Sequence, residues 1–296
     1  MFAVLSTTPG RSYAQETHVP LEVLVRQVDH ITLNADEPEQ LFRLFTETLG
    51  LPVDAPWRSL QVATNRTISV GSVGFDSIYV ELGHVQDRPP GLMGVGLEPG
   101  GSVSDVVAGL DAQGLKHGAP ALHYAIDSSG TIKDSSGKPE LAYTTVSMTS
   151  LLPGEIFFCQ YDAAHMLSRY GAADAGARRA RFQRDLQNHG GGPLGIQSIV
   201  ELGIGVSDIT AAKRDWRILL GPPQAGEEFV WQLGAGPAIR LVAAPEDHLV
   251  LLRMKVKSLE RARAFLKREN LLGLDTGHEL ALERSRVGPA DIRFVE

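Results

Sequence analysis

The sequence is poor in cysteine and in long apolar runs. Cys159 is the single cysteine among 296 residues, which excludes an intrachain disulfide and a zinc cluster built from several thiolates. The longest apolar runs, such as residues 199–206, are far shorter than the roughly 20 residues that a helix needs to span a bilayer. No basic residue lies among the first six, as a signal peptide would require. We therefore expect a cytoplasmic protein without a membrane segment.

The chain also lacks an excess of positive charge. Its 28 Lys and Arg residues stand against 35 Asp and Glu, a formal net charge of −7, so the general phosphate affinity of nucleic-acid-binding proteins is not expected. A hydrophobic content of 43% and a charged content of 21% are typical of a globular protein. The length suggests two domains of ordinary size. We expect the partner to be a small molecule and not a nucleic acid or a membrane.

A short strand followed by an amphipathic helix recurs four times. The strand and helix pairs are 28–35 and 36–50, 94–97 and 102–115, 199–206 and 208–220, and 249–256 and 258–271. Each helix is followed by short β-like runs that end in an apolar strand, at 77–82, 156–161, 238–243 and 291–296. The sequence therefore predicts an α+β chain of four βαβββ units. The first and third units align without a gap at an offset of 171, which places His30 on Glu201.

Polar side chains interrupt two of the predicted strands on one face only. Alternation places His30 on the same face as Thr32, opposite Ile31 and Leu33. In 77–82, Glu81 shares a face with Tyr79 in the same manner. An imidazole and a carboxylate on neighbouring strands are ligands that a divalent metal accepts while keeping positions open for substrate. The alternative is a hydrogen-bonded core histidine and a solvent-facing glutamate.

These features resemble the vicinal oxygen chelate superfamily, which includes glyoxalase I, bleomycin-resistance proteins and extradiol dioxygenases. The resemblance is carried by the Val-Asp-His-Ile-Thr-Leu run at 28–33, the Thr-Leu-Gly-Leu-Pro at 48–52, the Ile-Tyr-Val-Glu-Leu at 78–82 and the four units. It implies that two units form one cup-shaped barrel and that the chain holds two tandem barrels. It also implies that metal ligands come from the first and last strands of each unit.

The resemblance implies a metal site in the first barrel. His30 and Glu81 match the family ligand types, and Gln160 stands at the corresponding place in the second unit, whereas Gly94 replaces the histidine expected there. His123, His84 or water would complete the site. Tyr79, His123 and Tyr143 are the candidates for acid–base or supporting roles. Cys159 alternates with Gln160 and is expected to face away from the cavity.

The second barrel departs from the family pattern. Glu201 takes the position of His30, Val242 that of Glu81 and Leu251 the histidine position of the fourth unit, while Val295 or Glu296 ends it. The apolar substitutions suggest a degenerate barrel without metal.

The organisation that follows has four segments: a flexible arm at 1–25, an N-terminal barrel at 26–162, a linker at 163–195 and a C-terminal barrel at 196–296. The arginines of the linker, at 178, 179, 181 and 184, suggest a solvated helical face. The polar segment 127–140 suggests an exposed hairpin tip, with a lid over the cavity as the alternative.

Two classes of function remain open. The first is an enzyme that uses a divalent ion (Fe, Zn, Mn, Ni or Mg) on a small oxygenated organic substrate, aromatic compounds included, with dioxygenase, lyase or isomerase chemistry. The second is a metal-free protein that binds or sequesters a small molecule, as bleomycin-resistance proteins do. A monomer and a homodimer are both compatible with the sequence.

Overall fold

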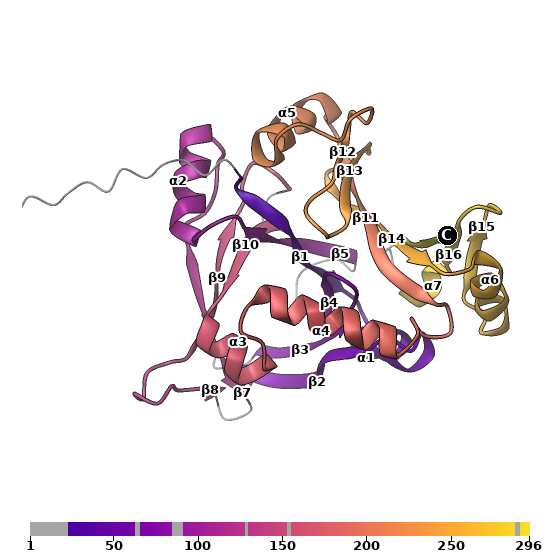
Figure 1. Ribbon diagram of the computed structural model, residues 1–296, viewed down its shortest axis with the longest axis horizontal. Helices are drawn as coiled ribbons and strands as arrows, with labels where there is room; N and C mark the ends of the chain where they lie inside the picture. The colour runs from indigo at the N-terminus through magenta and orange to yellow at the C-terminus, as the bar shows by residue number, and fades with distance from the viewer. Residues whose placement is uncertain (1–22, 63–65, 85–90, 128–129, 153–154, 288–290) are drawn as a thin grey trace, which may run out of the picture.

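The computed structural model describes residues 23–62, 66–84, 91–127, 130–152, 155–287 and 291–296. The expected N-terminal arm lies outside the described residues up to position 22. Figure 1 shows the two ends of the chain's folded part on different halves of the molecule, with strands of both halves meeting in the middle. None of the helices in the described ranges is long and apolar enough to cross a membrane.

The first half of the molecule contains units one and two. Unit one consists of β1 (Val25–Asn34), α1 (Pro38–Arg43), the π-helical turn η1 (Leu44–Thr48), β2 (Val53–Val62), β3 (Arg66–Gly74) and β4 (Tyr79–His84). Unit two consists of β5 (Gly91–Pro99), α2 (Val103–Gln113), β6 (Ala121–Tyr124), β9 (Leu141–Ser147) and β10 (Ile156–Tyr161). Between β6 and β9, the strands β7 (Ile126–Asp127) and β8 (Gly130–Thr131) form a small hairpin where the polar segment was predicted.

The second half contains units three and four. Unit three consists of β11 (Ile196–Val206), α5 (Ile209–Leu220), β12 (Val230–Trp231) and β13 (Ala238–Ala243), so two strands follow its helix instead of three. Unit four consists of β14 (His248–Val256), α6 (Leu259–Arg268), β15 (Leu272–Asp275), β16 (Leu280–Leu282), α7 (Arg284–Val287) and β17 (Asp291–Val295). The predicted first strand, helix and last strand are confirmed in all four units, but the third unit lacks one of the three strands that were predicted after its helix.

Strand pairing confirms that the four units share one topology. In each unit the first strand pairs in parallel with the last, as in β1 with β4, β5 with β10, β11 with β13 and β14 with β17. The first strands of units one and two pair antiparallel, and so do those of units three and four. Each half is therefore a curled half-barrel, and the two join where β5 meets β14 at Leu92 and Leu249.

Local sequence signals set the ends of the helices. Ser102 caps α2 in a reciprocal capping box with Asp105, and Asp208 and Ser258 cap α5 and α6 through their side-chain oxygens. Gly50, at a φ of +66°, follows the first helix where a left-handed residue is needed. These signals explain why the helix positions could be predicted closely.

The apolar faces of the strands form the core beneath the helices. Ile31, Leu33, Val80 and Leu82 are fully buried, as alternation predicted. Full burial of such a side chain stabilises the fold by about 1.5–3 kcal/mol. The opposite faces of β1, β4 and β10 form the concave side of the first half, which we call the N-terminal cup.

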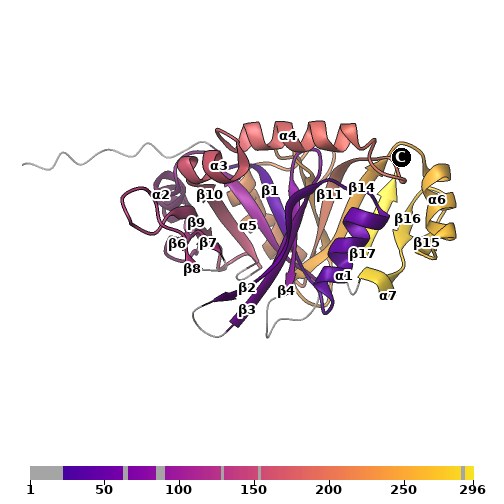
Figure 2. The same ribbon diagram turned by 90° about the horizontal axis from the view of Figure 1, so that it is seen from below.

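The segment expected to be a linker forms two helices, α3 (Ala163–Tyr170) and α4 (Ala175–Asn188). Asp162 and Asp174 cap them through their carboxylates. Figure 2 shows α4 lying along one side of the molecule, across strands of the first half and toward β11 of the second. The segment is therefore a structural part of the N-terminal cup as well as a connection.

Candidate functional site: the N-terminal cup

A β-bulge in β1 turns two consecutive polar residues into one hydrogen-bonded pair. The pairing of β1 with β5 shifts register between Val28 and His30, so Asp29 stands at the irregularity. The Asp29 Oδ2 atom lies 2.7 Å from Nδ1 of His30, and both residues are 6% exposed. Strict alternation would have placed these neighbours on opposite faces.

The His30 ring is held by three neighbours. It stacks on Tyr79 with ring centroids 4.7 Å apart and meets Phe157 edge-on at 5.4 Å. It also lies over Gly96, where an added Cβ would stand 2.3 Å from the imidazole Cε1. Among the described residues, no hydrogen bond reaches the His30 Nε2 atom. The Nδ1 contact therefore fixes the ring and leaves Nε2 for another partner.

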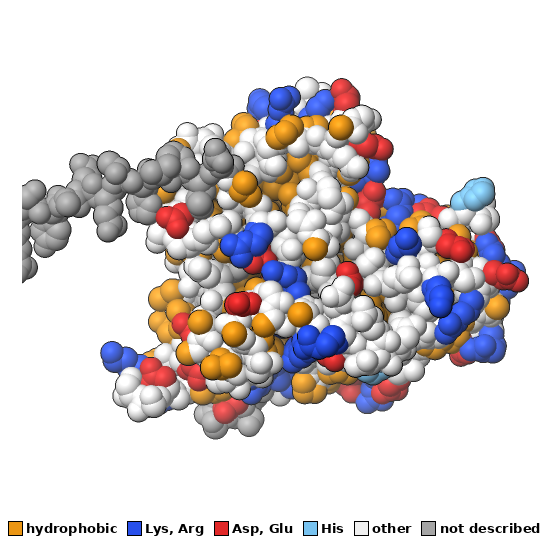
Figure 3. Space-filling model, viewed as in Figure 1, with side chains coloured by type: hydrophobic (Ala, Val, Ile, Leu, Met, Phe, Trp, Pro, Cys, Tyr) orange, Lys and Arg blue, Asp and Glu red, His pale blue; other side chains and the backbone are white. Residues whose placement is uncertain are grey.

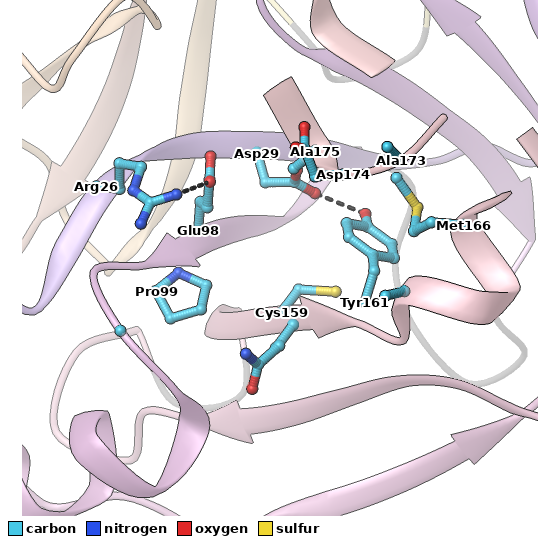
Figure 4. Close-up of a pocket in the computed structure, with 13 residues that line it drawn as sticks. Arg26, Asp29, Glu98, Pro99, Cys159, Tyr161, Met166, Ala173, Asp174 and Ala175 are labelled. Atoms are coloured by element: carbon cyan, nitrogen blue, oxygen red, sulfur yellow. Dashed lines mark hydrogen bonds and ion pairs between the residues drawn. The ribbon is translucent and has the colours of Figure 1, made fainter. Parts of the chain in front are cut away.

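Two tyrosine hydroxyls extend the hydrogen-bond chain from Asp29. The Tyr161 hydroxyl donates to Asp29 Oδ2 at 2.6 Å, and the hydroxyls of Tyr79 and Tyr161 lie 2.7 Å apart. Because the Tyr161 hydroxyl donates its proton to Asp29, the Tyr79 hydroxyl is the donor in the contact between the two tyrosines. Figure 4 shows the Asp29 and Tyr161 contact from the side of the adjoining cavity.

Burial and charge fix the protonation of these groups. Burial alone would raise the pKa of Asp29, but hydrogen bonds from His30 and Tyr161, the charge of Arg178 and the charge that His30 carries when protonated outweigh burial and lower that pKa. Burial, with the negative charge of Asp29, raises the pKa of both Tyr79 and Tyr161 well above the usual range. At neutral pH the cup therefore holds an ionised Asp29 and protonated tyrosines.

Helix α4 inserts an arginine into the cup. Arg178 is 3% exposed, and its guanidinium carbon lies 4.2 Å from the ring centre of Tyr79 and 4.1 Å from that of Tyr170. Its Nη2 atom donates to Asp54 Oδ2 at 2.6 Å, and Arg181 donates to the other oxygen of Asp54. The prediction of a solvated arginine face is therefore wrong for Arg178, because this face of α4 packs into the cup.

The rest of the face that carries α4 is mixed in charge. Basic and acidic side chains lie next to one another across it, without a large patch of one sign (Figure 3). Arg179, for example, is bound to Glu98 at 2.5 Å, and Arg26 binds the other oxygen of Glu98 at 2.9 Å. The linker arginines thus hold α4 to the strands of the first half.

A cavity of about 240 Å³ adjoins the cup beneath the α3–α4 connection. Asp29, Cys159 and Tyr161 line it from the strands, and Asp174 and Ala175 line it from the start of α4 (Figure 4). Asp29 therefore contacts both His30 and this cavity. Its lining of polar and apolar groups suits a small organic molecule or ordered water.

The structure does not bring the three predicted metal ligands, His30, Glu81 and Gln160, to one place. Glu81 is half-buried two residues beyond Tyr79 on β4, opposite Thr32, and no described residue pairs with its carboxylate. Gln160 points to the other face of β10, where its Oε1 atom accepts the Val103 N–H at the start of α2 at 3.0 Å. The cup brings His30 and Glu81 to one wall and leaves Gln160 outside it.

The faces of β10 are the reverse of the sequence expectation. Phe157 contacts His30 and Tyr161 contacts Asp29, so alternation places Cys159, which lies between them, on the cup side. Cys159 lines the cavity described above and is 3% exposed. The prediction that Cys159 faces away is wrong, because the strand was aligned with β4 one residue out of register.

The other predicted residues form a second aromatic pair. His123 stacks on Tyr143 at 4.5 Å, and its Nε2 atom lies 2.9 Å from Thr145 Oγ1. Tyr143 meets Tyr161 edge-on at 6.2 Å, which joins the pair to the hydrogen-bond chain from Asp29. Burial and the charge of Glu81 raise the pKa of Tyr143. The side chain of His84 lies outside the described residues.

The side chains of the described residues do not form the metal centre that the family resemblance implies. Within those residues, no three side chains of His, Cys, Asp or Glu converge on one point. His30 and Glu81 supply two unpaired donors, but Gly94 has no side chain to add and the amide of Gln160 caps α2. A catalytic site for zinc or a related ion usually has three protein ligands.

The corresponding surface of the second half, the C-terminal cup, is filled by ion pairs. Glu201 accepts from Arg240 at 2.8 Å and from Arg253, which in turn donates to Glu279 at 2.9 Å. The strand register pairs Thr32 with Glu81 and Gly203 with Arg240, so the counterpart of Glu81 is Arg240. The assignment of Val242 was therefore two residues off.

Three residues that form the contacts of the cup were missed in the sequence. Asp29 was hidden because only the bulge brings it beside His30, and Tyr161 because of the register of β10. Arg178 stood in a segment taken for a linker. The Asp162 and Asp174 helix caps were the available signal that this segment folds.

Several solved structures are similar to this chain. An extradiol ring-cleaving dioxygenase from Brevibacterium fuscum aligns with a TM-score of 0.57 at 9% identity and covers 94% of this chain and 73% of that chain. Homoprotocatechuate 2,3-dioxygenase from Arthrobacter globiformis gives a TM-score of 0.53 at 9% identity, with 95% and 84% covered. A hypothetical protein from Staphylococcus aureus gives 0.56 at 9%, with 90% and 97% covered.

These likenesses show a fold of the vicinal oxygen chelate type and do not select a member of it. No protein-family model and no curated protein matches the chain. The function has to be argued from the cup itself.

Proposed function

We propose that this protein is an enzyme of the vicinal oxygen chelate fold that transfers a proton on a small oxygenated organic substrate in the N-terminal cup. One observation carries the proposal: His30 is anchored through Nδ1 to the buried Asp29 and keeps Nε2 without a partner among the described residues. A histidine so oriented by a carboxylate is a common general base.

The roles of the residues follow from their protonation. His30 Nε2 takes a proton from a carbon or hydroxyl of the substrate, and Asp29 stabilises the imidazolium that forms. Tyr161 keeps Asp29 ionised and in place through its hydrogen bond, and Tyr79 donates in turn to Tyr161. Tyr143, protonated at neutral pH, is the candidate donor to a substrate oxygen that gains charge. His123 orients Tyr143 by stacking on it.

Deuterium exchange tests the proton transfer directly. The protein is incubated in D2O with a panel of small hydroxyketones and 2-oxo acids, and NMR follows exchange at the carbon next to the carbonyl. We expect exchange with the wild type and a loss of about 10²–10⁴-fold in His30→Gln. His248→Gln, in β14 of the second half, is the matched control and should leave the rate unchanged. An unchanged rate in His30→Gln would refute the role of His30.

Elemental analysis of protein purified without chelator or affinity metal tests the same residue independently. A metal-bound Nε2 could not act as a base, so one equivalent of metal in the wild type that is lost in His30→Ala would replace the proposal with a metal site on His30 and Glu81. We expect no stoichiometric metal in either protein, because the described residues supply two donors.

Binding without turnover is the second candidate function. It is favoured by the rings of Tyr79, Tyr161, Tyr170 and Phe182, which surround Arg178 and would suit a sequestered aromatic compound. Specific binding of a panel compound that shows no exchange in D2O, with saturation at one equivalent, would select this function.

A further inference from the structure

The guanidinium of Arg178 has more donors than partners. Its Nη2 is bound to Asp54, but Nε and Nη1 are buried and make no hydrogen bond with any described residue, and neither does Nε of Arg181. Buried N–H groups are nearly always paired with protein, water or ligand. The cup therefore contains buried donors that the protein fold does not use.

The carboxylate of Asp54 does not use all the donors of the two arginines beside it. Asp54 has no exposed side-chain surface and accepts from Arg178, Arg181 and Ser72. Two guanidinium groups share this one carboxylate, and the ionised Asp29 acts on Arg178 through its charge without a hydrogen bond to it. The nearby carboxylate of Asp29 is already used by His30 and Tyr161. Glu81 forms no ion pair with Arg178 within the described residues.

The rings around Arg178 restrict what can approach it. The rings of Tyr79 and Tyr170 lie 4.2 and 4.1 Å from the guanidinium carbon. Because the N–H bonds of a guanidinium lie in its plane, the unpaired Nε and Nη1 donors point outward from its edges. A planar carboxylate can present its oxygens along these edges.

We propose that Arg178, delivered by α4, binds the carboxylate group of a small organic acid in the N-terminal cup. This deepens the proposed function, on which it rests, by naming the substrate class as a carboxylic acid. Arg178 is the specificity-determining residue, and Asp54 is a positioning residue that holds one edge of its guanidinium.

Benzoate and benzamide are the probes, because they have the same shape and differ in charge. Isothermal titration of the wild type should show benzoate binding at least about tenfold more tightly than benzamide. Arg178→Met should remove that preference. Arg178→Lys keeps the positive charge and serves as the second variant in case Arg178→Met does not fold. It should also weaken benzoate binding, because an ammonium lacks the planar donor edge of a guanidinium. Arg263→Met, at an exposed ion pair with Asp275, is the matched control.

Three outcomes would overturn the proposal: no benzoate binding by folded wild-type protein at millimolar concentration, equal binding of benzoate and benzamide, or unchanged benzoate binding in both Arg178 variants. Titration of His30→Gln separates this proposal from the proposed function. Benzoate binding retained there and lost in Arg178→Lys supports the carboxylate site even if no proton exchange is found. Proton exchange that survives in Arg178→Met, without any preference for acids, supports His30 alone.

Discussion

The two cups of this molecule share the same strand geometry but differ in how their polar side chains are paired. In β1 the register shifts at Val28/His30, and in β11 it shifts at Ile199/Glu201, which is the same position at the offset of 171. His30 is paired across the ladder with Gly96, whereas Glu201 is paired with Arg253. A glycine leaves room for an imidazole with a free nitrogen, and an arginine fills the equivalent place with an ion pair.

Charge balance separates the cups in the same way. In the C-terminal cup, Glu201, Arg240, Arg253 and Glu279 are paired with one another. In the N-terminal cup, His30 Nε2, Glu81 and two nitrogens of Arg178 have no partner in the described part of the chain. The duplicated halves therefore differ in whether their polar groups are paired with one another.

The largest effect is expected from Asp54→Ala. This change leaves Arg178 buried without its carboxylate, and breaking a buried ion pair costs about 3–5 kcal/mol. Urea denaturation gives the free energy of unfolding. The control is Asp275→Ala, at the partly exposed pair with Arg263, where we expect about 0–1 kcal/mol. Similar losses at both sites would contradict the burial argument.

Glu201→Gln tests the structural role of the C-terminal cup. The change removes the charge that holds Arg240 and Arg253, although Glu227 and Glu279 still bind them. We expect a loss of about 1.5–3 kcal/mol in stability and no change in benzoate binding. Weaker benzoate binding in this variant would place the carboxylate site in the wrong cup.

Gly96→Ala should fill the space beside His30 that distinguishes the N-terminal cup from the C-terminal cup. The added Cβ would lie 2.3 Å from Cε1 and 2.5 Å from Nδ1 of His30, so the ring or the strand must shift. We expect a loss of about 1–3 kcal/mol in stability together with slower proton exchange. Gly118→Ala is the control, since its nearest neighbour would be 3.8 Å away. If the two variants behave alike, His30 is not tightly held.

The smallest effect concerns pH. Burial lowers the pKa of His123, so the unfolded chain binds this proton more readily than the folded protein. The contribution of His123 to stability is therefore complete above its unfolded pKa of about 6.5 and is lost as pH falls through the lower folded value. Unfolding free energies from pH 8 to 5 should decline less in His123→Phe. An equal decline would show that His123 does not contribute.

How far the sequence could predict the fold depended on the kind of signal. Apolar alternation and helix caps located β1, α2, α5 and α6 closely, because these are local properties. Which face of a strand each residue occupies was predicted less reliably. An error of one residue on β10 exchanged Gln160 for Cys159 and Tyr161, since a strand turns over completely with each step.

The sequence by itself determined the repeated unit, its α+β class, and the polar positions His30 and Glu81, because periodicity and residue type are written along the chain. Only the tertiary structure decided which polar groups meet. The bulge brings Asp29 to His30, and α4 carries Arg178 from a presumed linker to Tyr79 and Asp54. The hydrogen bonds of the cup join residues up to 132 positions apart, and they depend on strand register and helix packing that no local pattern specifies.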